Sequence, residues 1–492
     1  MKNIHMIGIG GISMSGIAEL LLSEGYTVSG SDAHESEMTD KLEELGAKIG
    51  YPQKADNIPE DTDTVVMTAA IHSDNPELLE AQRRGLKVWT RAEFLGEIMK
   101  KYNTPIAIAG THGKTTTTGM VSEILVKAGM DPTISIGGML KDIGGNFRVG
   151  SSDYFVMEAC EYTNSYHAFY PKVGVILNVE ADHLDFFKDI DDIRRSFHRF
   201  GENVFEDGTL VIGKEIEKYQ VITEGLKCKV VTFGRDESAD IYPTDVVYDE
   251  LAQPAFTANM DGKSERYRLG VHGEHNVMNA LAAIAACKSI GISYEDIKKG
   301  LEEYKGTDRR FELKGKLKVM AGKSGSGADG TEAGADDKGT GMVGSGTDGT
   351  EAGTAGRGSG ITIIDDYAHH PTEIKATLKT AAAYPHNNMW VVFQPHTYTR
   401  TKALMDEFAE ALSMAEHVII TDIYPARETD NLGISGKTLA DRISEKGTEC
   451  YYIGGFDEVK KFIKKTLVDN DLLITMGAGD VVKIGDELLS EM

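Results

Sequence analysis

The sequence predicts an α/β protein built from several domains. Its 492 residues are enough for two to four domains, each with its own core. Short apolar runs of strand length alternate with stretches that repeat apolar residues at helical spacing, which favours parallel sheets covered by helices. After residues 4–7 and again after residues 106–109, an apolar run leads directly into a glycine turn and a helix. Such a turn is typical of a nucleotide-binding α/β domain.

The N-terminal glycine turn indicates a nucleotide diphosphate site. Gly8, Gly10 and Gly11 follow the first expected strand, and Asp32 ends the second. The third glycine of the dinucleotide fingerprint would fall at Ser13, so the pattern is imperfect. It favours a diphosphate at the start of a helix, and not a nicotinamide in particular. Further strands are expected at 26–29, 65–67 and 86–89, with a helix at 76–84.

The second glycine turn predicts a phosphate site. Its residues are Gly110, Thr111, His112, Gly113, Lys114, Thr115 and Thr116. The usual phosphate loop would need glycine at 108, where this chain has Ile108, so the pattern is Gly-x-x-Gly-Lys-Thr. Backbone N–H groups at a helix start favour phosphate, Lys114 can reach terminal phosphates, and the Thr115 hydroxyl can bind Mg²⁺.

Polar side chains also mark the ends of later strands. Glu158 ends the apolar run 154–158, while Asn178 lies in the run 173–179 and His183 follows it. Ligands of doubly wound sheets collect at the carboxyl ends of strands, so we expect these groups near Lys114. Carboxylate and hydroxyl oxygens suit Mg²⁺. By itself, His183 is more typical of a hydrogen-bonding residue than of a magnesium ligand.

The C-terminal region predicts a third α/β domain. Strands are expected at 361–364, 389–393, 417–423 and 471–476. Two dense polar clusters follow the first two strands. The first contains Asp366, Tyr367, His369 and His370, and the second contains Gln394, His396, Thr397 and Arg400.

A low-complexity insert, residues 322–360, interrupts an expected hairpin between residues 317–320 and 361–364. It consists mostly of Gly, Ser, Thr, Ala, Asp and Glu. Because it lacks the apolar surface that offsets chain ordering, we predict a flexible loop.

Composition narrows the function classes. The formal net charge is −25, which argues against nonspecific nucleic-acid binding. The four cysteines, Cys160, Cys228, Cys287 and Cys450, are far apart, so neither a disulfide framework nor a thiolate metal site is expected. We expect no signal peptide and no membrane span, since no apolar run reaches about 18 residues. A reducing cytoplasm is the simplest compartment.

Together, these motifs resemble those of the Mur ligases, which build the peptide stem of bacterial peptidoglycan. The resemblance rests on residues 8–16, 110–117, 178–185 and 272–279, on Arg-Arg-Phe at 309–311, and on the two C-terminal clusters. It covers the chain apart from the insert. It implies three domains: a Rossmann-like UDP-binding domain at 1–103, a P-loop ATPase-like domain at 104–308, and a Rossmann-like amino-acid-binding domain at 309–492.

The resemblance is to the alanine-adding branch of the family, and it implies a reaction. ATP would activate the lactyl carboxylate of UDP-N-acetylmuramate as an acyl phosphate, which L-alanine would then attack. Mg²⁺ or Mn²⁺ would be the cofactor and ATP a co-substrate. The implied partners are these small molecules, with no nucleic acid and no membrane insertion, and the chain would be a cytoplasmic monomer or weak homodimer.

The resemblance also implies roles for individual residues. The catalytic residues would be Lys114, His183 and Arg310, and the metal ligands Thr115, Glu158 and His183. ATP would contact residues 110–116, Asn276, Arg310 and Asp366, although Asn276 is equally natural as a helix cap. The UDP-sugar would contact Gly10, Gly11, Asp32, Ala70 and Ile71, although residues 68–71 are equally natural as a plain turn. The amino acid would contact Tyr367, His369, His396 and Arg400, of which Arg400 suits a carboxylate best.

The chain departs from the family at two places. Relatives often carry Glu-Ala-Asp-Glu-Ser where this chain has Glu158-Ala159-Cys160-Glu161-Tyr162, so Glu158 is kept while an Asp and a Ser are replaced. Many relatives have arginine at the position of Thr397. Any substrate contact made by the replaced residues is therefore in question, and Cys160 fits a buried small residue better than a nucleophile.

Three other functions agree with part of the sequence. A recycling ligase that attaches a preformed peptide shares most of the motifs. An NAD-dependent oxidoreductase would rest on residues 8–16 alone and leave Lys114 unexplained. A regulator without catalysis would need degraded phosphate or metal positions, whereas Lys114, Thr115, Glu158 and His183 are all present.

Overall fold

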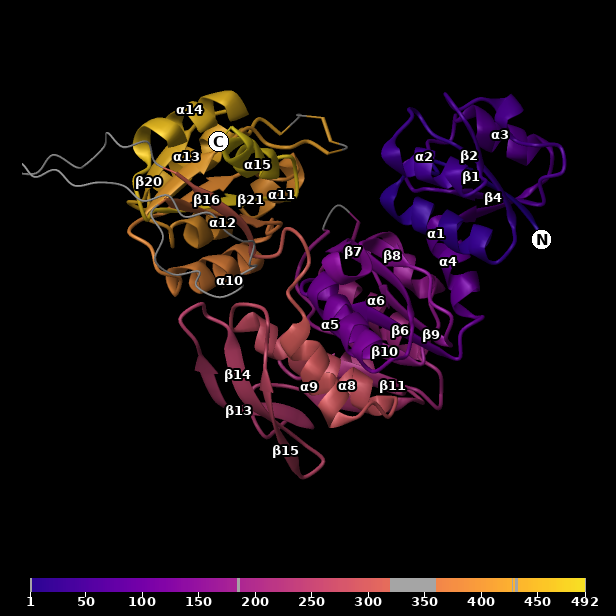
Figure 1. Cartoon of the computed structure of the whole chain (residues 1–492), viewed down its shortest axis with the longest axis horizontal. Coiled ribbons are helices and arrows are strands. Elements are labelled where there is room, and N and C mark those ends of the chain that lie inside the picture. The colour runs from indigo at the N-terminus through magenta and orange to yellow at the C-terminus, as the bar shows by residue number, and fades with distance from the viewer. Residues whose placement is uncertain (1, 184–185, 319–359, 427, 430–431, 492) are drawn as a thin grey trace, which may run out of the picture. The chain divides into compact units, whose positions relative to one another are not determined.

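The computed structural model describes residues 2–183, 186–318, 360–426, 428–429 and 432–491. The chain divides into two compact units, Met1–Glu312 and Leu313–Met492, and each is described by itself. Three separate sheets with helices between their strands confirm the predicted α/β class (Figure 1). The insert predicted to be a flexible loop lies, apart from Gly360, outside the described residues.

The first sheet is a parallel sheet with strand order β3-β2-β1-β4-β5. Its strands are β1 (Asn3–Ile7), β2 (Thr27–Ser31), β3 (Lys48–Gly50), β4 (Thr64–Met67) and β5 (Lys87–Thr90). The helices are α1 (Ile12–Ser23), α2 (Glu37–Glu44), η1 (Ala55–Asn57), α3 (Pro76–Arg83) and α4 (Arg91–Met99). The strand order reverses between β1 and β4, where doubly wound folds bind their ligands.

The second sheet has ten strands, in the order β15-β14-β13-β12-β11-β10-β6-β9-β7-β8. Its strands are β6 (Thr104–Ala109), β7 (Thr133–Leu140), β8 (Gly145–Arg148), β9 (Tyr154–Glu158), β10 (Val173–Ile176), β11 (Thr209–Gly213), β12 (Lys229–Phe233), β13 (Ile241–Tyr248), β14 (Pro254–Met260) and β15 (Lys263–Arg268). The helices are α5 (Lys114–Lys127), η2 (Lys141–Ile143), η3 (Tyr162–Ala168), α6 (Ile190–Glu202), α7 (Tyr219–Thr223), α8 (His275–Ser289) and α9 (Tyr294–Glu303).

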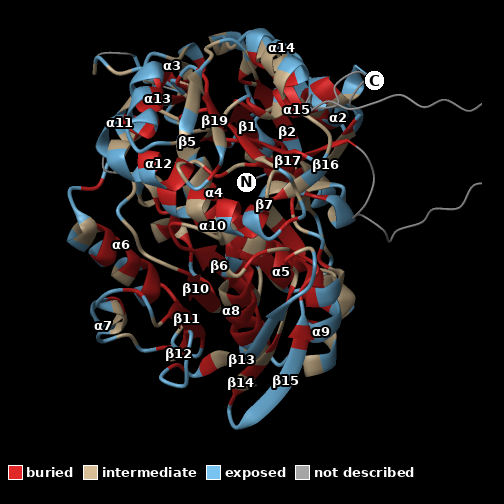
Figure 2. Cartoon of the chain, turned by 90° about the vertical axis from the view of Figure 1, so that its left-hand side faces the viewer, coloured by how far each residue is buried: buried red, intermediate tan, exposed pale blue. Residues whose placement is uncertain are grey.

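The core of this sheet explains its continuous apolar strands. Residues of β6, β10, β11 and α8 are mostly buried, whereas β15 is largely exposed (Figure 2). Helices α8 and α9 both pack against α5. α8 is buried nearly all round, and its five alanines let neighbouring elements approach closely.

The third sheet, in the second unit, has the order β16-β17-β21-β18-β19-β20, and its strands from β17 to β20 are parallel. Its strands are β16 (Glu312–Leu317), β17 (Ile361–Asp366), β18 (Met389–Phe393), β19 (His417–Ile420), β20 (Glu449–Tyr452) and β21 (Leu472–Met476). The helices are α10 (Pro371–Ala382), α11 (Tyr398–Ala403), α12 (Met405–Leu412), α13 (Gly436–Ser444), α14 (Phe456–Thr466) and α15 (Val482–Ser490).

Some predicted strand bounds were wrong. β10 ends at Ile176 and not at residue 179, because the side chain of Asn178 bonds to the backbone of a neighbouring loop. β19 ends at Ile420 and not at residue 423. β16 (Glu312–Leu317) overlaps the strand expected at 317–320 only at Leu317, and residues 319 and 320 of that expected strand lie outside the described residues.

Candidate functional site

Strand order explains why the predicted site residues of the second sheet converge. β6 lies between β9 and β10 and runs parallel to both. The segments that follow these three strands therefore leave the sheet at one edge. They are residues 110–113, 159–162 and 177–183.

The glycine turn after β6 leaves a helix start open. Gly110 and Gly113 have φ values of +141° and +81°, which side-chain-bearing residues rarely adopt. A Cβ on Gly113 would also lie 2.5 Å from Asn279 Oδ1. Gly113 precedes α5 with no side-chain cap, so its first N–H groups are available in the way that suits phosphate.

Asn178 holds the middle of this turn. Its Oδ1 accepts from the His112 backbone N–H at 2.7 Å, and its Nδ2 donates to the His112 carbonyl at 3.0 Å. The Thr111 hydroxyl accepts from the Glu180 backbone N–H at 2.9 Å. Thr111 and His112 thus fix the shape of the turn, whereas Thr115 and Thr116 lie in the first turn of α5, buried and half-buried.

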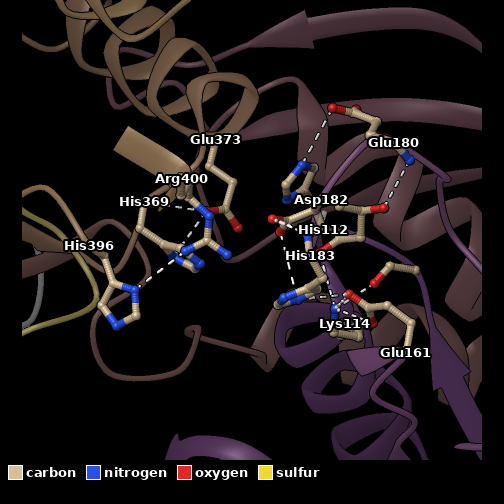
Figure 3. A network of polar contacts seen from close by, with 12 residues as sticks. His112, Lys114, Glu161, Glu180, Asp182, His183, His369, Glu373, His396 and Arg400 are labelled. Carbon is tan, nitrogen blue, oxygen red and sulfur yellow. Dashed lines mark hydrogen bonds and ion pairs between the residues drawn. The ribbon is translucent and has the colours of Figure 1, made fainter. Parts of the chain in front are cut away.

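Lys114 is held by a carboxylate that sequence reasoning did not single out. Its Nζ lies 3.0 and 3.2 Å from the two carboxylate oxygens of Glu161 (Figure 3). The ammonium also donates to the carbonyls of Gly110 and Thr111, at 2.5 and 3.0 Å. Burial disfavours the charged ammonium, but the neighbouring Glu161 carboxylate outweighs this effect and the pKa of Lys114 is raised. Glu161 is 3% exposed and the Lys114 side chain 16%, so this ion pair is largely buried.

His183 faces the same carboxylate. Its Nε2 lies 3.7 Å from Glu161 Oε1 and 3.8 Å from Asp182 Oδ2 (Figure 3). The Tyr162 ring stacks on the imidazole, with ring centroids 4.5 Å apart. The structure therefore brings His183 beside Lys114 through Glu161, as the strand-end argument predicted for those two groups.

Glu158 and Thr115 lie beside two consecutive glycines of β7. The Gly137 backbone N–H donates to Glu158 Oε1 at 2.7 Å. A Cβ on Gly137 would lie 2.8 Å from Glu158 Oε2, and a Cβ on Gly138 would lie 3.1 Å from Thr115 Cγ2. The glycine pair therefore leaves room that a side chain would fill, next to a carboxylate and near a threonine. These oxygen donors fit a hard divalent cation such as Mg²⁺.

Arg310 lies in a turn that is anchored to the end of β7. The neighbouring Asp308 N–H donates to the Met139 carbonyl at 3.0 Å. Burial raises the pKa of the Tyr304 hydroxyl. The charge of Arg310 lowers this pKa and the charge of Glu158 raises it, so both charges act on the same hydroxyl. Arg310 thus follows a segment tied to β7, the strand whose Gly137 contacts Glu158.

Asn276 is not a helix cap. It lies within the first turn of α8, where its Nδ2 donates to the His272 carbonyl at 2.7 Å and its Oδ1 accepts from Asn279 Nδ2 at 2.9 Å. The cap position is Glu274. Asn279, which was not predicted, in turn lies against Gly113. The Asn-x-x-Asn spacing, which puts both amides on one helix face, was the available signal.

The turn after β1 is closed by Asp32. Asp32 Oδ2 accepts from the Gly10 N–H at 2.8 Å, and Gly11 is the residue before α1. Asp32 therefore orders the glycine turn itself. Arg91, which was not predicted, donates to Ser13 Oγ in the first turn of α1 at 2.9 Å. Burial lowers the pKa of Arg91.

The second predicted segment of this region is a hydrogen-bonded turn. The Ile71 N–H donates to the Thr68 carbonyl at 3.2 Å, with Ala70 exposed and Ile71 half-buried. Thr68 in turn lies against Gly8, where a Cβ would be 2.6 Å from Thr68 Cγ2. Residues 68–71 therefore form a closed turn beside the glycine turn that follows β1.

In the second unit, Asp366 orders the loop after β17. Asp366 Oδ1 accepts from the Ala368 N–H at 2.8 Å, and its Oδ2 accepts from the Thr377 hydroxyl at 3.0 Å. Asp366 is 6% exposed. Tyr367 lies next to it, with its ring edge-on to His369 at a centroid distance of 5.4 Å.

The residues predicted to bind the amino-acid substrate lie close together in this unit. Arg400 lies with one guanidinium nitrogen 3.4 Å from His396 Nδ1, and the His369 and His396 rings are 5.8 Å apart (Figure 3). Glu373, which was not predicted, accepts from the His369 N–H at 3.0 Å. The loops after β17 and β18 leave the sheet on either side of β21, which explains their approach. Thr397 has φ +67°, immediately before α11.

Comparison with family models covers most of the chain. Residues 3–103 match the model described as "Mur ligase family, catalytic domain", residues 108–287 match "Mur ligase middle domain", and residues 354–479 match "Mur ligase, glutamate ligase domain".

Two curated relatives match along their whole lengths. A UDP-N-acetylmuramate–L-alanine ligase of Lachnospira eligens is 52% identical over 489 residues, which covers 99% of this chain and 98% of the relative. One of Agathobacter rectalis is 49% identical over 490 residues, with the same coverage.

A solved structure is also similar. The UDP-N-acetylmuramate-alanine ligase of Thermotoga maritima matches with a TM-score of 0.75 and 30% identity, covering 99% of this chain and 98% of that one. A murein peptide ligase of Psychrobacter arcticus, at 24% identity and a TM-score of 0.67, shares the fold.

Proposed function

Since the chain belongs to the Mur ligase family, we propose that it joins L-alanine to the lactyl carboxylate of UDP-N-acetylmuramate at the expense of ATP. The observation that carries this proposal is the 52% identity over nearly the whole chain to a relative of that activity. The open helix start at Lys114 supplies the phosphate site that the reaction needs.

We propose a division of labour among the three sheets. Residues 1–103 would hold the UDP-sugar through Gly10, Gly11 and the turn at Ala70 and Ile71, with Asp32 shaping the glycine turn. Residues 104–308 would hold ATP through the turn 110–116, with Asn276 near the base. Residues 309–492 would hold L-alanine through Tyr367, His369, His396 and Arg400, with Asp366 toward the ATP ribose.

The chemistry begins with a carboxylate, which is a poor electrophile. Its oxygen would attack the γ-phosphorus of ATP, breaking the bond to ADP and giving an acyl phosphate. Lys114 and Arg310 would offset the negative charge on the transferred phosphoryl group. The L-alanine amine would then attack the carbonyl carbon and lose a proton, and the tetrahedral intermediate would release phosphate. No covalent bond to the chain is needed, so positioning of three substrates is the main contribution of the protein.

We propose that Glu158 and Thr115 hold Mg²⁺, with His183 at the metal or the acyl phosphate. Their oxygens and the space over Gly137 and Gly138 fit such an ion. When bound, Mg²⁺ supplies charge neutralisation of the phosphates. Arg400 would pair with the alanine carboxylate, because a guanidinium binds a carboxylate through two parallel hydrogen bonds.

We also propose the cytoplasm as the compartment, since ATP and a nucleotide sugar are the substrates. No helix in the described part of the chain is long and apolar enough to cross a membrane.

The test is ADP release with Mg²⁺, ATP and UDP-N-acetylmuramate, with and without L-alanine. Release that depends on L-alanine supports the proposal. Release that depends instead on an L-Ala-D-Glu-diamino acid tripeptide would assign the chain to the recycling reaction, and release with neither would contradict both.

A further inference from the structure

One short turn contacts two of the predicted catalytic groups of the second sheet. This turn, Cys160-Glu161-Tyr162, leads from β9 into η3, whose first residue is Tyr162. The Glu161 carboxylate lies 3.0 Å from Lys114 Nζ, and the Tyr162 ring lies over His183, with the ring planes at 29°. Lys114 follows β6 and His183 follows β10, so the two groups reach this turn from two other strands.

The turn itself is fixed to the core. The Asn164 N–H donates to the Glu161 carbonyl at 2.9 Å, and the Tyr166 N–H donates to the Cys160 carbonyl at 3.2 Å. The Tyr166 side chain is fully buried and stacks on Phe200, with centroids 5.1 Å apart. A turn anchored in this way can hold other groups in place before a ligand arrives.

The polar contacts that the His183 imidazole makes within the described residues are long. Its Nε2 is 3.7 Å from Glu161 and 3.8 Å from Asp182, and both distances exceed a hydrogen bond. The Tyr162 ring, by contrast, stacks on the imidazole with the ring centroids 4.5 Å apart. The Phe186 ring in turn packs edge-on against Tyr162, at a centroid distance of 6.1 Å. The ring of Tyr162 therefore restricts rotation of the imidazole.

Polar contacts, and not ring stacking, restrict the position of the Lys114 side chain. Its ammonium has three donors, and the carbonyls of Gly110 and Thr111 and the Glu161 carboxylate provide an acceptor for each. This arrangement confines a long, flexible side chain to one direction along the phosphate loop.

We infer that Glu161 and Tyr162 are positioning residues, which set the directions of the Lys114 ammonium and the His183 imidazole for phosphoryl transfer. The inference rests on the proposed ligase function. Its physical basis is that a reacting group misplaced by about 1 Å can lose on the order of 100-fold in rate. Neither residue needs to touch a substrate.

The Tyr162 contact is tested with Tyr162→Phe and Tyr162→Leu, the second of which keeps apolar volume but loses the flat ring. Tyr170→Ala, an exposed residue just after η3, is the matched control. We expect the Leu variant to lose roughly 10- to 100-fold in kcat. The Michaelis constants of the Leu variant for UDP-N-acetylmuramate and L-alanine should stay within about twofold of the wild-type values. Tyr162→Phe and the control Tyr170→Ala should both keep the wild-type kcat.

The same assay tests Glu161 with Glu161→Gln, which keeps an acceptor for Lys114 and removes the charge. We expect Glu161→Gln to lower kcat. In the double variant Glu161→Gln, Tyr162→Leu, the fold-loss in kcat should be smaller than the product of the two single fold-losses, because both residues position the same pair, the Lys114 ammonium and the His183 imidazole. Circular dichroism and the melting temperature of each variant check folding. A Leu variant with wild-type kcat, or equal losses in Phe and Leu, would overturn the inference. Absence of alanine-dependent ADP release by the wild type would instead count against the proposed function.

Discussion

The backbone N–H of Gly137 donates to Glu158 Oε1 at 2.7 Å, which ties the end of β9 to the neighbouring strand β7. This bond orients the Glu158 carboxylate, whereas the sequence predicted only that Glu158 ends a strand. It also makes the glycine a sensitive position, since a Cβ at residue 137 would displace that carboxylate.

Gly137→Ala should therefore impair metal use. The added Cβ would lie 2.8 Å from Glu158 Oε2, so the carboxylate must turn away. We expect kcat to fall by about 10-fold or more and the Mg²⁺ concentration for half-maximal rate to rise. The control is Gly145→Ala in the same hairpin, where the nearest atom to an added Cβ is 3.7 Å away. Equal Mg²⁺ dependence in the two variants would contradict a metal role for Glu158.

Removal of the Lys114 charge should reduce stability as well as activity. Lys114→Met leaves the buried Glu161 carboxylate without its cation, which costs roughly 3–5 kcal/mol for a buried pair. We expect a lower urea midpoint together with loss of ADP release. The double variant Lys114→Met, Glu161→Gln should recover much of the lost stability without recovering activity. If the single variant is as stable as the wild type, the pair is not a buried ion pair.

Acid stability should depend on Glu77. Burial raises the pKa of this carboxyl, but hydrogen bonds from His5, Ser31 and Asn57 outweigh burial and the pKa is lowered. Its contribution to stability is therefore complete above the usual value near 4.5 and is lost as pH falls through the lower folded value. Glu77→Gln should cost about 1–3 kcal/mol at pH 7.

Unfolding free energies measured between pH 7 and pH 3 test this expectation. The difference between Glu77→Gln and the wild type should shrink toward pH 3. Glu80 of the same helix, which pairs with the exposed Arg83 at the surface, provides the comparison, since Glu80→Gln should change stability little at any pH. A Glu77→Gln effect that grows on acidification would contradict the assignment.

Arg91 should strengthen binding of the diphosphate. Its guanidinium donates to Ser13 at the open start of α1, where a diphosphate is proposed to bind. A charged hydrogen bond contributes about 1.5–3 kcal/mol, so Arg91→Met should weaken UDP binding about 10- to 100-fold by calorimetry. The control is Arg83→Met, an exposed residue paired with Glu80. Unchanged affinity for UDP in Arg91→Met would remove Arg91 from the site.

Arg400 should govern use of L-alanine. Lysine keeps the charge but not the two-pronged geometry that matches a carboxylate. Arg400→Lys is therefore expected to raise the Michaelis constant for L-alanine by roughly 10-fold or more, with that for ATP unchanged. Arg442→Lys, an exposed residue of α13, is the control. A selective effect on ATP would place Arg400 elsewhere.

Local patterns predicted most of the fold. Apolar runs and glycine turns placed β1, β6, β9 and β18 within a residue or two, because these strands are buried and the turns need glycine. Strand ends that depend on partners elsewhere were less predictable. β10 stops at Ile176 because Asn178 bonds to His112, a contact that joins residues 66 positions apart.

The positions of candidate site residues were predictable where a residue lies at, or shortly after, the carboxyl end of a strand. Lys114, Glu158 and His183 were placed by that rule. Glu161 was overlooked because it stood in a segment that departs from the family pattern, although a second carboxylate three residues after Glu158 was visible in the sequence. Arg91 gave no local signal, since its contact with Ser13 depends on how α4 returns to the first sheet.

The most direct test of the proposed chemistry follows one oxygen atom. UDP-N-acetylmuramate labelled with ¹⁸O in its lactyl carboxylate is incubated with ATP, Mg²⁺, L-alanine and the chain, and the phosphate and nucleotide products are analysed by mass spectrometry. Activation as an acyl phosphate predicts UDP-N-acetylmuramoyl-L-alanine and one labelled oxygen in the inorganic phosphate. Amide product with unlabelled phosphate would contradict carboxylate activation by phosphoryl transfer, and no amide product would contradict the ligase itself.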